Sequence, residues 1–242
     1  GPYPFADDKR GGAETPHLGS GHQTSNAYGN EYRKAEAGYD WLLQHEFAHE
    51  WFGNQLTHLD WDDFWLHEGF GSYMQPLCLQ WLRGDMEYMA ALIKQRAAIV
   101  NRYPVISGRG LPENEVYKPG EGPGNDVYYK GSLTLHTLRG LIGDDAFFRA
   151  TRELVYGTAT PRPGNFKPRY ASTADFIAIV NRITGKDLGW FFDGYLRSAK
   201  LPELLASREG NVLSLRWKTQ GDTLFPLPVQ VRVGDRIVDV AM

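Results

Sequence analysis

The pentapeptide HEFAH at residues 45–49 constrains the fold of this chain more than any other stretch of its sequence. It lies in a segment, residues 41–52, that is predicted to form a helix, with Asp40 as its N-cap and a Gly-Asn pair as its stop. On a helix, positions i and i+4 lie on one face, so His45 and His49 point the same way. Two imidazoles placed like this can both reach one metal ion at about 2.0–2.1 Å. The pentapeptide therefore predicts a helix that supplies two metal ligands.

A metal site of this kind needs a third ligand, because a helix can also carry two ordinary histidines by chance. Catalytic zinc sites have three protein ligands and one open position. Glu68 lies on the next predicted helix and can supply that ligand if the two helices pack antiparallel. His67 and Glu50 are alternatives. Gly69, next to Glu68, either gives room near the metal or serves ordinary packing.

The bulk composition places the chain among ordinary globular proteins. With 242 residues, 42% of them hydrophobic and 23% charged, it has room for one large domain or two. A net charge of -3 gives no basic surface for nucleic acid, so no nucleic-acid partner is expected. No apolar run reaches the roughly 18 residues that a membrane-spanning helix needs. Cys78 is the only cysteine and is predicted to be a buried, inert thiol.

The residue pattern changes at about position 200. Before it the chain is mainly α, apart from residues 1–40, which are predicted to be loop with one or two short strands. The predicted helices span residues 41–52, 62–83, 85–103, 127–141, 144–156, 172–184 and 187–199. Pro76 predicts a kink or break in the second helix. Residues 104–126 form a long Gly- and Pro-rich loop, which is often functional in a compact domain.

Beyond Pro202, residues 212–217 and 229–233 alternate with period two, as strands do. The pair Gly234-Asp235 predicts a hairpin turn after the second of these strands. The strands are too few for a complete sandwich, and the first residues do not resemble a natural N-terminus. We therefore expect a fragment of a longer protein, with residues 1–200 in one domain and residues 201–242 beginning a β domain.

The stretch from His45 to Tyr73, HEFAHEWFGNQLTHLDWDDFWLHEGFGSY, resembles the signature of the gluzincin aminopeptidases. That family includes alanyl aminopeptidases and the bifunctional leukotriene hydrolase. Its pattern is H-E-x-x-H, then W-F-G-N, then W-L-x-E-G-F, in which the glutamate is the third zinc ligand. The resemblance implies that His45, His49 and Glu68 hold one zinc ion per chain. It further implies that Glu46 is the general base and that peptides are the substrates.

The same resemblance implies a fold. Residues 1–200 are expected to be the helical part of a thermolysin-like zinc metallopeptidase catalytic domain that lacks its N-terminal portion. Residues 201–242 are expected to begin a β-sandwich-like domain.

The segment VYYKG at residues 127–131 is similar to the family's Y-x-K-G segment, which precedes a helix. The family's tyrosine at that place donates a hydrogen bond to the tetrahedral oxyanion. Residue by residue it corresponds to Tyr128, two positions before Lys130. Tyr129 is the neighbour most easily confused with it. The alternative interpretation is a pair of packing aromatic side chains at the start of a helix.

The sequence departs from the family upstream of the zinc helix. Aminopeptidases of the family carry a G-x-M-E-N-like segment, and one subgroup has G-M-E-H-Q, whereas residues 19–23 here are GSGHQ. The resemblance implies that Gly19, Gly21 and His22 bind substrate. Gly21 stands where the family's glutamate binds the free α-amine. Losing a buried charge partner typically costs about 2–5 kcal/mol, so we expect a weakened preference for a free N-terminus unless Glu50 or another acid replaces it.

Three functions remain compatible with these residues. The leading hypothesis is a zinc aminopeptidase that removes N-terminal residues from peptides. The others are a zinc hydrolase of epoxides or esters and a zinc-binding fragment without peptidase activity. Glu46 and Tyr128 favour catalysis, because a structural zinc site needs neither. Asp62 and Asp63 either orient a ligand histidine or cap the second helix. The sequence assigns neither localisation nor oligomeric state.

Overall fold

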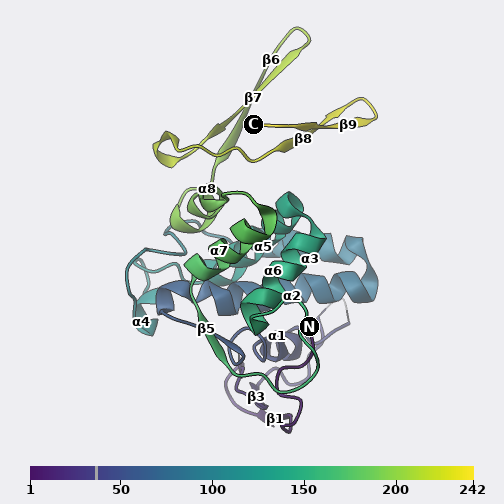
Figure 1. The fold of residues 1–242 in the computed structure, drawn as a ribbon, viewed down its shortest axis with the longest axis vertical. Helices are drawn as coiled ribbons and strands as arrows, with labels where there is room; N and C mark the ends of the chain where they lie inside the picture. The colour runs from purple at the N-terminus through teal and green to yellow at the C-terminus, as the bar shows by residue number, and fades with distance from the viewer. Residues whose placement is uncertain (36–37) are drawn as a thin grey trace.

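The computed structural model describes residues 1–35 and 38–242. A body of packed helices occupies the centre, with short N-terminal strands on one side and two β-hairpins on the other (Figure 1). Within the described ranges, no helix is both long and apolar enough to cross a membrane.

The N-terminal segment forms a small sheet of three strands, β1 (Gly11–Glu14), β2 (Gly19–Ser20) and β3 (Ser25–Tyr28). The central strand β3 pairs with β1 in parallel and with β2 antiparallel. The Tyr28 hydroxyl donates a hydrogen bond to Asp40, the N-cap of the following helix. This bond joins the sheet to the helix that carries the HEFAH pentapeptide.

Helix α1 (Trp41–Ala48) begins as predicted, because the Asp40 side chain accepts a hydrogen bond from Leu43 N at 3.0 Å. It ends four residues before the predicted Phe52. The backbone amides of Glu50 and Trp51 bond three residues back instead of four, which tightens the last turn. His49 is thus the C-cap of the helix.

Helices α2 (Trp65–Arg83), α3 (Asp85–Ala97) and α5 (Asp126–Ile142) pack together at the centre, and α2 also contacts α1. Trp65, Phe70 and Tyr73 of α2 are fully buried, and burying one such side chain stabilises the fold by about 1.5–3 kcal/mol. A Cβ placed on Gly69 would lie 3.0 Å from the Cα of Gly131 on α5. Gly69 therefore serves close helix packing, one of its two predicted roles.

Pro76 does not break α2, which runs from Trp65 to Arg83, so the predicted break was wrong. A proline inside a helix cannot donate to the carbonyl four residues back, which here belongs to Ser72. The side chain of Gln95 on α3 donates to that carbonyl at 2.9 Å instead. Gln95 also accepts a hydrogen bond from Ser132 of α5 at 2.6 Å. A buried amide from the neighbouring helix thus compensates for the missing backbone donor.

The remaining helices close the body around this centre. They are the 3₁₀ turn η1 (Trp61–Asp63), α4 (Glu113–Val116), α6 (Asp144–Tyr156), α7 (Thr173–Thr184), α8 (Gly189–Phe192) and a π-helical turn, Asp193–Arg197. Ser172 caps α7 in a capping box with Asp175. Strands β4 (Leu56–His58) and β5 (Arg169–Ala171) pair in parallel and join the connector after α1 to the segment before α7.

The long loop predicted at residues 104–126 begins earlier, because α3 ends at Ala97 and not at residue 103, and it contains the short helix α4; three carboxylate groups hold it in place. Asp126 accepts hydrogen bonds from the amides of Val100 and Asn101 at 2.8 and 2.7 Å. Asp62 accepts from the amides of Ser107 and Gly108 at 2.7 and 2.8 Å. In addition, Asp60 accepts from Leu111 N at 3.0 Å. Among the described residues, Asp62 therefore bonds to the loop and to neither His45 nor His49, while Asp63 accepts a bond from Thr173 N at the start of α7.

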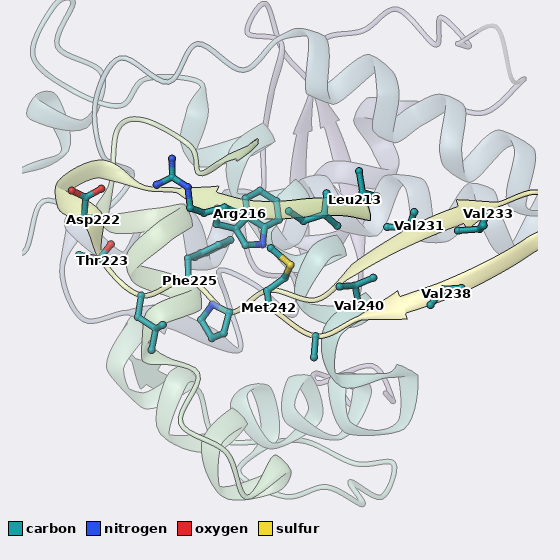
Figure 2. A pocket seen from close by; sticks show the side chains of 15 residues that line it. Leu213, Arg216, Asp222, Thr223, Phe225, Val231, Val233, Val238, Val240 and Met242 are labelled. Carbon is teal, nitrogen blue, oxygen red and sulfur yellow. The ribbon is translucent and has the colours of Figure 1, made fainter. Parts of the chain in front are cut away.

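The last forty residues form two hairpins, β6 (Glu203–Glu209) with β7 (Val212–Lys218) and β8 (Val229–Val233) with β9 (Arg236–Val240). The short 3₁₀ turn η3 (Gln220–Asp222) lies between the hairpins. The predicted turn at Gly234-Asp235 joins β8 to β9. Figure 2 shows the groove of about 680 Å³ between the hairpins, which is lined mainly by apolar side chains.

Candidate metal centre

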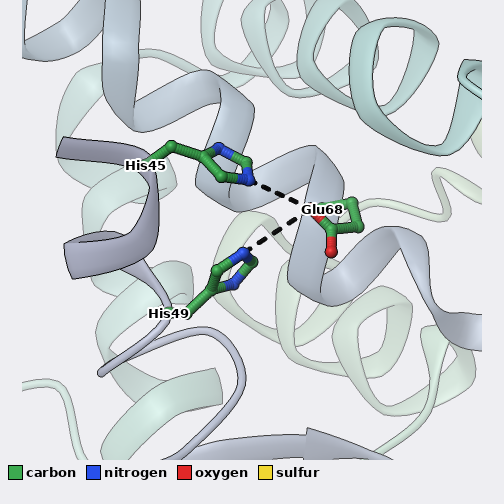
Figure 3. A group of neighbouring side chains, drawn as sticks. All are labelled: His45, His49 and Glu68. Carbon is green, nitrogen blue, oxygen red and sulfur yellow. Dashed lines mark ion pairs between the residues drawn. The ribbon is translucent and has the colours of Figure 1, made fainter. Parts of the chain in front are cut away.

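Two helices bring His45, His49 and Glu68 together, as the sequence predicts (Figure 3). The histidines project from the C-terminal end of α1, and Glu68 lies in the first turn of α2. Glu68 Oε2 lies 3.2 Å from His45 Nε2 and 3.6 Å from His49 Nε2. One potential ligand atom from each residue lies within 4.8 Å of the other two, and all three residues are buried.

The hydrogen bonds around this group fit a metal ion. His49 Nδ1 lies 2.9 Å from the carbonyl oxygen of Phe52, which can only accept, so the proton is on Nδ1 and the lone pair is on Nε2. Metal-binding histidines typically have such a partner. Glu68 Oε2 is buried without a hydrogen-bond partner among the described residues, which is costly for a carboxylate. Two imidazole nitrogens and a carboxylate oxygen form a donor set that suits zinc.

The two alternative third ligands are occupied elsewhere. His67 Nε2 accepts a hydrogen bond from the amide of His58 at 3.1 Å. Burial lowers the pKa of His67 well below its usual range. Glu50 is fully buried and accepts a hydrogen bond from Thr24 N at 3.1 Å. These contacts favour Glu68 as the third ligand.

A glycine gives the histidine rings their room, but it is Gly71 and not Gly69. A Cβ on Gly71 would lie 3.3 Å from Cε1 of His45 and 3.4 Å from Cε1 of His49. Gly71 is three residues after Glu68, so it faces α1 from the same side of α2. The sequence gives no signal that separates these two glycines.

Glu46 lies beside the three residues in a cleft of about 370 Å³. Its Oε2 atom is buried without a hydrogen-bond partner in the part of the chain that the structure describes. Burial, opposed by His49, raises the pKa of Glu46 to about 7. A carboxyl group with a pKa near neutrality, free of protein partners and next to a metal-binding group, has the properties of a general base.

Tyr128, in the first turn of α5, lines the same cleft, and its ring centroid lies 6.2 Å from that of His45. Tyr129 does not line this cleft and lies only in the adjoining one. The geometry thus favours Tyr128 over its neighbour as the hydroxyl that faces a bound substrate.

The upstream segment reaches the cleft only in part. Gly19 and Gly21 line it, whereas His22 is exposed and outside its described lining. A Cβ on Gly19 would overlap the carboxylate of Glu46, and one on Gly21 would lie 2.5 Å from the Cβ of His49. The structure thus gives no support to the prediction that His22 binds substrate, and it shows that both glycines lie close to side chains of α1.

Sequence reasoning missed Glu113, which lies on α4 in the long loop and lines the cleft. Trp61 and Phe64 line it too. Of the other tryptophans, Trp65 is fully buried and Trp81 is 84% exposed. The only available signal was the length of the loop, since no residue spacing connects it to the HEFAH pentapeptide.

Comparison with known proteins identifies the family. The model of the peptidase family M1 domain matches residues 28–195, which include every predicted metal ligand. The chain belongs to peptidase family M1. The resemblance drawn from residues 45–73 is therefore confirmed at the level of the family.

Individual M1 proteins are similar over part of their length. Aminopeptidase N of Lactococcus lactis subsp. lactis is 27% identical over 185 residues, which are 73% of this chain and 20% of that protein. A glutamyl aminopeptidase of Rattus norvegicus is 24% identical over 73% of this chain and 18% of its own length. The chain thus spans about a fifth of these curated relatives.

Solved structures of M1 proteins share the fold. One is a variant of an M1 zinc metallopeptidase from Deinococcus radiodurans, bound to a Tyr-Ser-Ala substrate. It is 25% identical to this chain with a TM-score of 0.63, and the match covers 80% of this chain and 40% of that one. A Legionella pneumophila aminopeptidase A in complex with aspartic acid has a TM-score of 0.69 at 20% identity, over 96% of this chain and 28% of that one. The fold is therefore that of M1 peptidases.

Proposed function

We propose that this M1 chain is the catalytic part of a zinc aminopeptidase, with His45, His49 and Glu68 as the ligands of one zinc ion. The observation that carries the proposal is the convergence of two imidazole nitrogens on a buried carboxylate oxygen, 3.2 and 3.6 Å away, beside a free carboxyl group in the same cleft. A structural metal site needs no such second carboxyl group. The names of the M1 relatives support the same activity.

The chemistry is divided between the metal and the protein. Bound zinc supplies Lewis-acid activation of water and of a carbonyl group. Glu46 takes a proton from the attacking water and returns it to the leaving amine. Burial raises the pKa of Glu46 to about 7, so its carboxyl group can both accept and release a proton near neutral pH. The hydroxyl of Tyr128 donates a hydrogen bond where negative charge develops on the substrate oxygen.

We further propose that Glu113 binds the substrate's ammonium group in place of the missing glutamate at Gly21. The described lining of the cleft contains the carboxylates of Glu46, Glu68 and Glu113 and no lysine or arginine. The first two have roles at the metal, and Glu113 makes no hydrogen bond or ion pair within the described ranges. It is exposed, so its attraction for an ammonium group is that of a surface ion pair, about 0.2–1 kcal/mol.

The amine preference can be measured by comparing hydrolysis of a dipeptide amide with that of its N-acetylated twin. An anchor at the exposed Glu113 predicts a preference for the free amine below about tenfold, since tenfold corresponds to about 1.4 kcal/mol. Glu113→Gln should abolish this preference, while Glu115→Gln, on the same short helix, should keep it. A preference of several hundredfold, or one that survives Glu113→Gln, would show that another acid binds the amine.

The domain assignment stays a proposal. Residues 1–200 are proposed to be the helical part of a thermolysin-like catalytic domain and residues 201–242 to begin a β-sandwich-like domain. In support, the hairpins β6–β7 and β8–β9 stand apart from the helical body (Figure 1), with apolar side chains facing the groove between them.

A further inference from the structure

We propose that Tyr117 is a positioning residue that orients the hydroxyl group of Tyr128 toward the substrate carbonyl, an inference that rests on the function proposed above. The two hydroxyl oxygens lie 2.7 Å apart, a normal hydrogen-bond distance between hydroxyl groups. They come from different segments, since Tyr117 follows α4 in the long loop and Tyr128 lies in the first turn of α5.

The direction of this hydrogen bond follows from the task of Tyr128. A tyrosine hydroxyl has one proton to donate and can accept in addition. If Tyr128 donates its proton to the substrate oxygen, its own oxygen is left to accept the proton of Tyr117. Accepting that bond fixes the rotation of the Tyr128 hydroxyl about its C–O axis and polarises it, because hydrogen bonds in a chain strengthen one another.

Tyr117 has a defined position although its side chain is 39% exposed. The carboxylates of Asp60, Asp62 and Asp126 bind five backbone amides of the loop that carries it. Its ring also contacts Phe64 edge to face, with centroids 6.1 Å apart and planes at 84°. The loop is therefore held by contacts that do not depend on the Tyr117 hydroxyl.

This arrangement separates a positioning role from a merely structural one. Tyr117→Phe keeps the ring and its packing and removes only the donor to Tyr128. Loss of one neutral hydrogen bond should lower kcat about two- to tenfold and leave KM within about twofold. Affinity for a dipeptide phosphonate, which presents tetrahedral oxygens to the same hydroxyl, should fall by the same factor in a calorimetric titration.

The decisive experiment is a double-mutant cycle in the zinc-loaded protein with Tyr117→Phe, Tyr128→Phe and the double variant. The inference predicts that Tyr117→Phe has no further effect on kcat or phosphonate affinity once Tyr128 is phenylalanine. Equal effects in both backgrounds, or no effect of Tyr117→Phe in the wild-type background, would overturn it.

A control variant in the same loop is Tyr103→Phe, which removes a hydroxyl that donates to the carbonyl of Gly120 outside the cleft. It should lower thermal stability and leave kcat unchanged, and a fall in kcat matching that of Tyr117→Phe would contradict a specific role. A different result tests the proposed function itself, which would be refuted if the wild-type protein and Glu46→Gln hydrolysed peptides at equal rates.

Discussion

Restoring the family's glutamate at position 21 should damage this site instead of repairing it. The family pattern suggests that Gly21→Glu would recreate the amine anchor. In the structure, however, even the first carbon of a side chain at position 21 would lie 2.5 Å from Cβ and 2.9 Å from Cδ2 of His49. Real Cβ atoms do not approach other carbons so closely, so a residue other than glycine must push away either His49 or the segment that carries residue 21.

His49 has little freedom to move. Its Cβ is fixed to the last turn of α1, and its Nδ1 is bonded to the carbonyl of Phe52. Forcing extra carbon atoms into a packed site typically costs about 1–3 kcal/mol. If that strain falls on a zinc ligand, zinc affinity drops by about 5- to 150-fold, because 1.4 kcal/mol corresponds to a factor of ten.

Zinc dissociation constants can be measured by competition with a chromophoric chelator for wild type, Gly21→Ala and Gly21→Glu. Gly11→Ala, in strand β1 of the neighbouring sheet, is the control, since a Cβ there would meet only the carbonyl of Thr24 at 3.9 Å. We expect both substitutions at Gly21 to weaken zinc binding and the control to leave it unchanged. Wild-type zinc affinity in Gly21→Glu, together with a gained preference for free amines, would refute the steric argument.

Two further predictions concern the helical core. Gln95→Met leaves the Ser72 carbonyl and the Ser132 hydroxyl without their partner, which costs about 1–3 kcal/mol for each group. In urea unfolding, the free energy of unfolding should therefore fall clearly more than for Gln75→Met, a control at a half-buried glutamine that donates to the Trp41 carbonyl. Equal losses of unfolding free energy would contradict the role of Gln95 at Pro76. Burial lowers the pKa of Lys130 from 10.5 to about 8, so the unfolded chain binds more protons between these values and stability rises with pH there. Between pH 7 and 9.5, the free energy of unfolding of the wild type should rise by about 2 kcal/mol relative to that of Lys130→Met. A difference in unfolding free energy that does not change with pH would contradict this.

The convergence of His45, His49 and Glu68 was predictable largely because two of them are close in sequence. His45 and His49 share one helix turn, so helical geometry suffices for that pair, whereas the choice of Glu68 over His67 and Glu50 came from the resemblance to the family signature. The capping of α1 by Asp40 and of α7 by Ser172 was predictable for the same reason. The β-hairpin turn at Gly234-Asp235 likewise depends on adjacent residues.

What the sequence could not show depends on contacts between distant segments. Glu113 lines the cleft and Tyr117 reaches the hydroxyl of Tyr128 from a loop that is held by Asp60 and Asp62, which accept hydrogen bonds from amides 45 to 51 residues further along the chain. The continuity of α2 through Pro76 depends on a side chain from another helix. Neither kind of contact leaves a periodic pattern, so propensity alone predicts a free loop and a broken helix.

The central claim is that His45, His49 and Glu68 bind the zinc ion at which Glu46 acts as general base. The most direct test compares zinc content and aminoacyl-anilide hydrolysis in wild type and Glu46→Gln. We predict one zinc per chain in both proteins and a loss of at least about a hundredfold in kcat for the variant, the usual contribution of a general base. Loss of zinc in Glu46→Gln, or undiminished hydrolysis with zinc bound, would contradict the account.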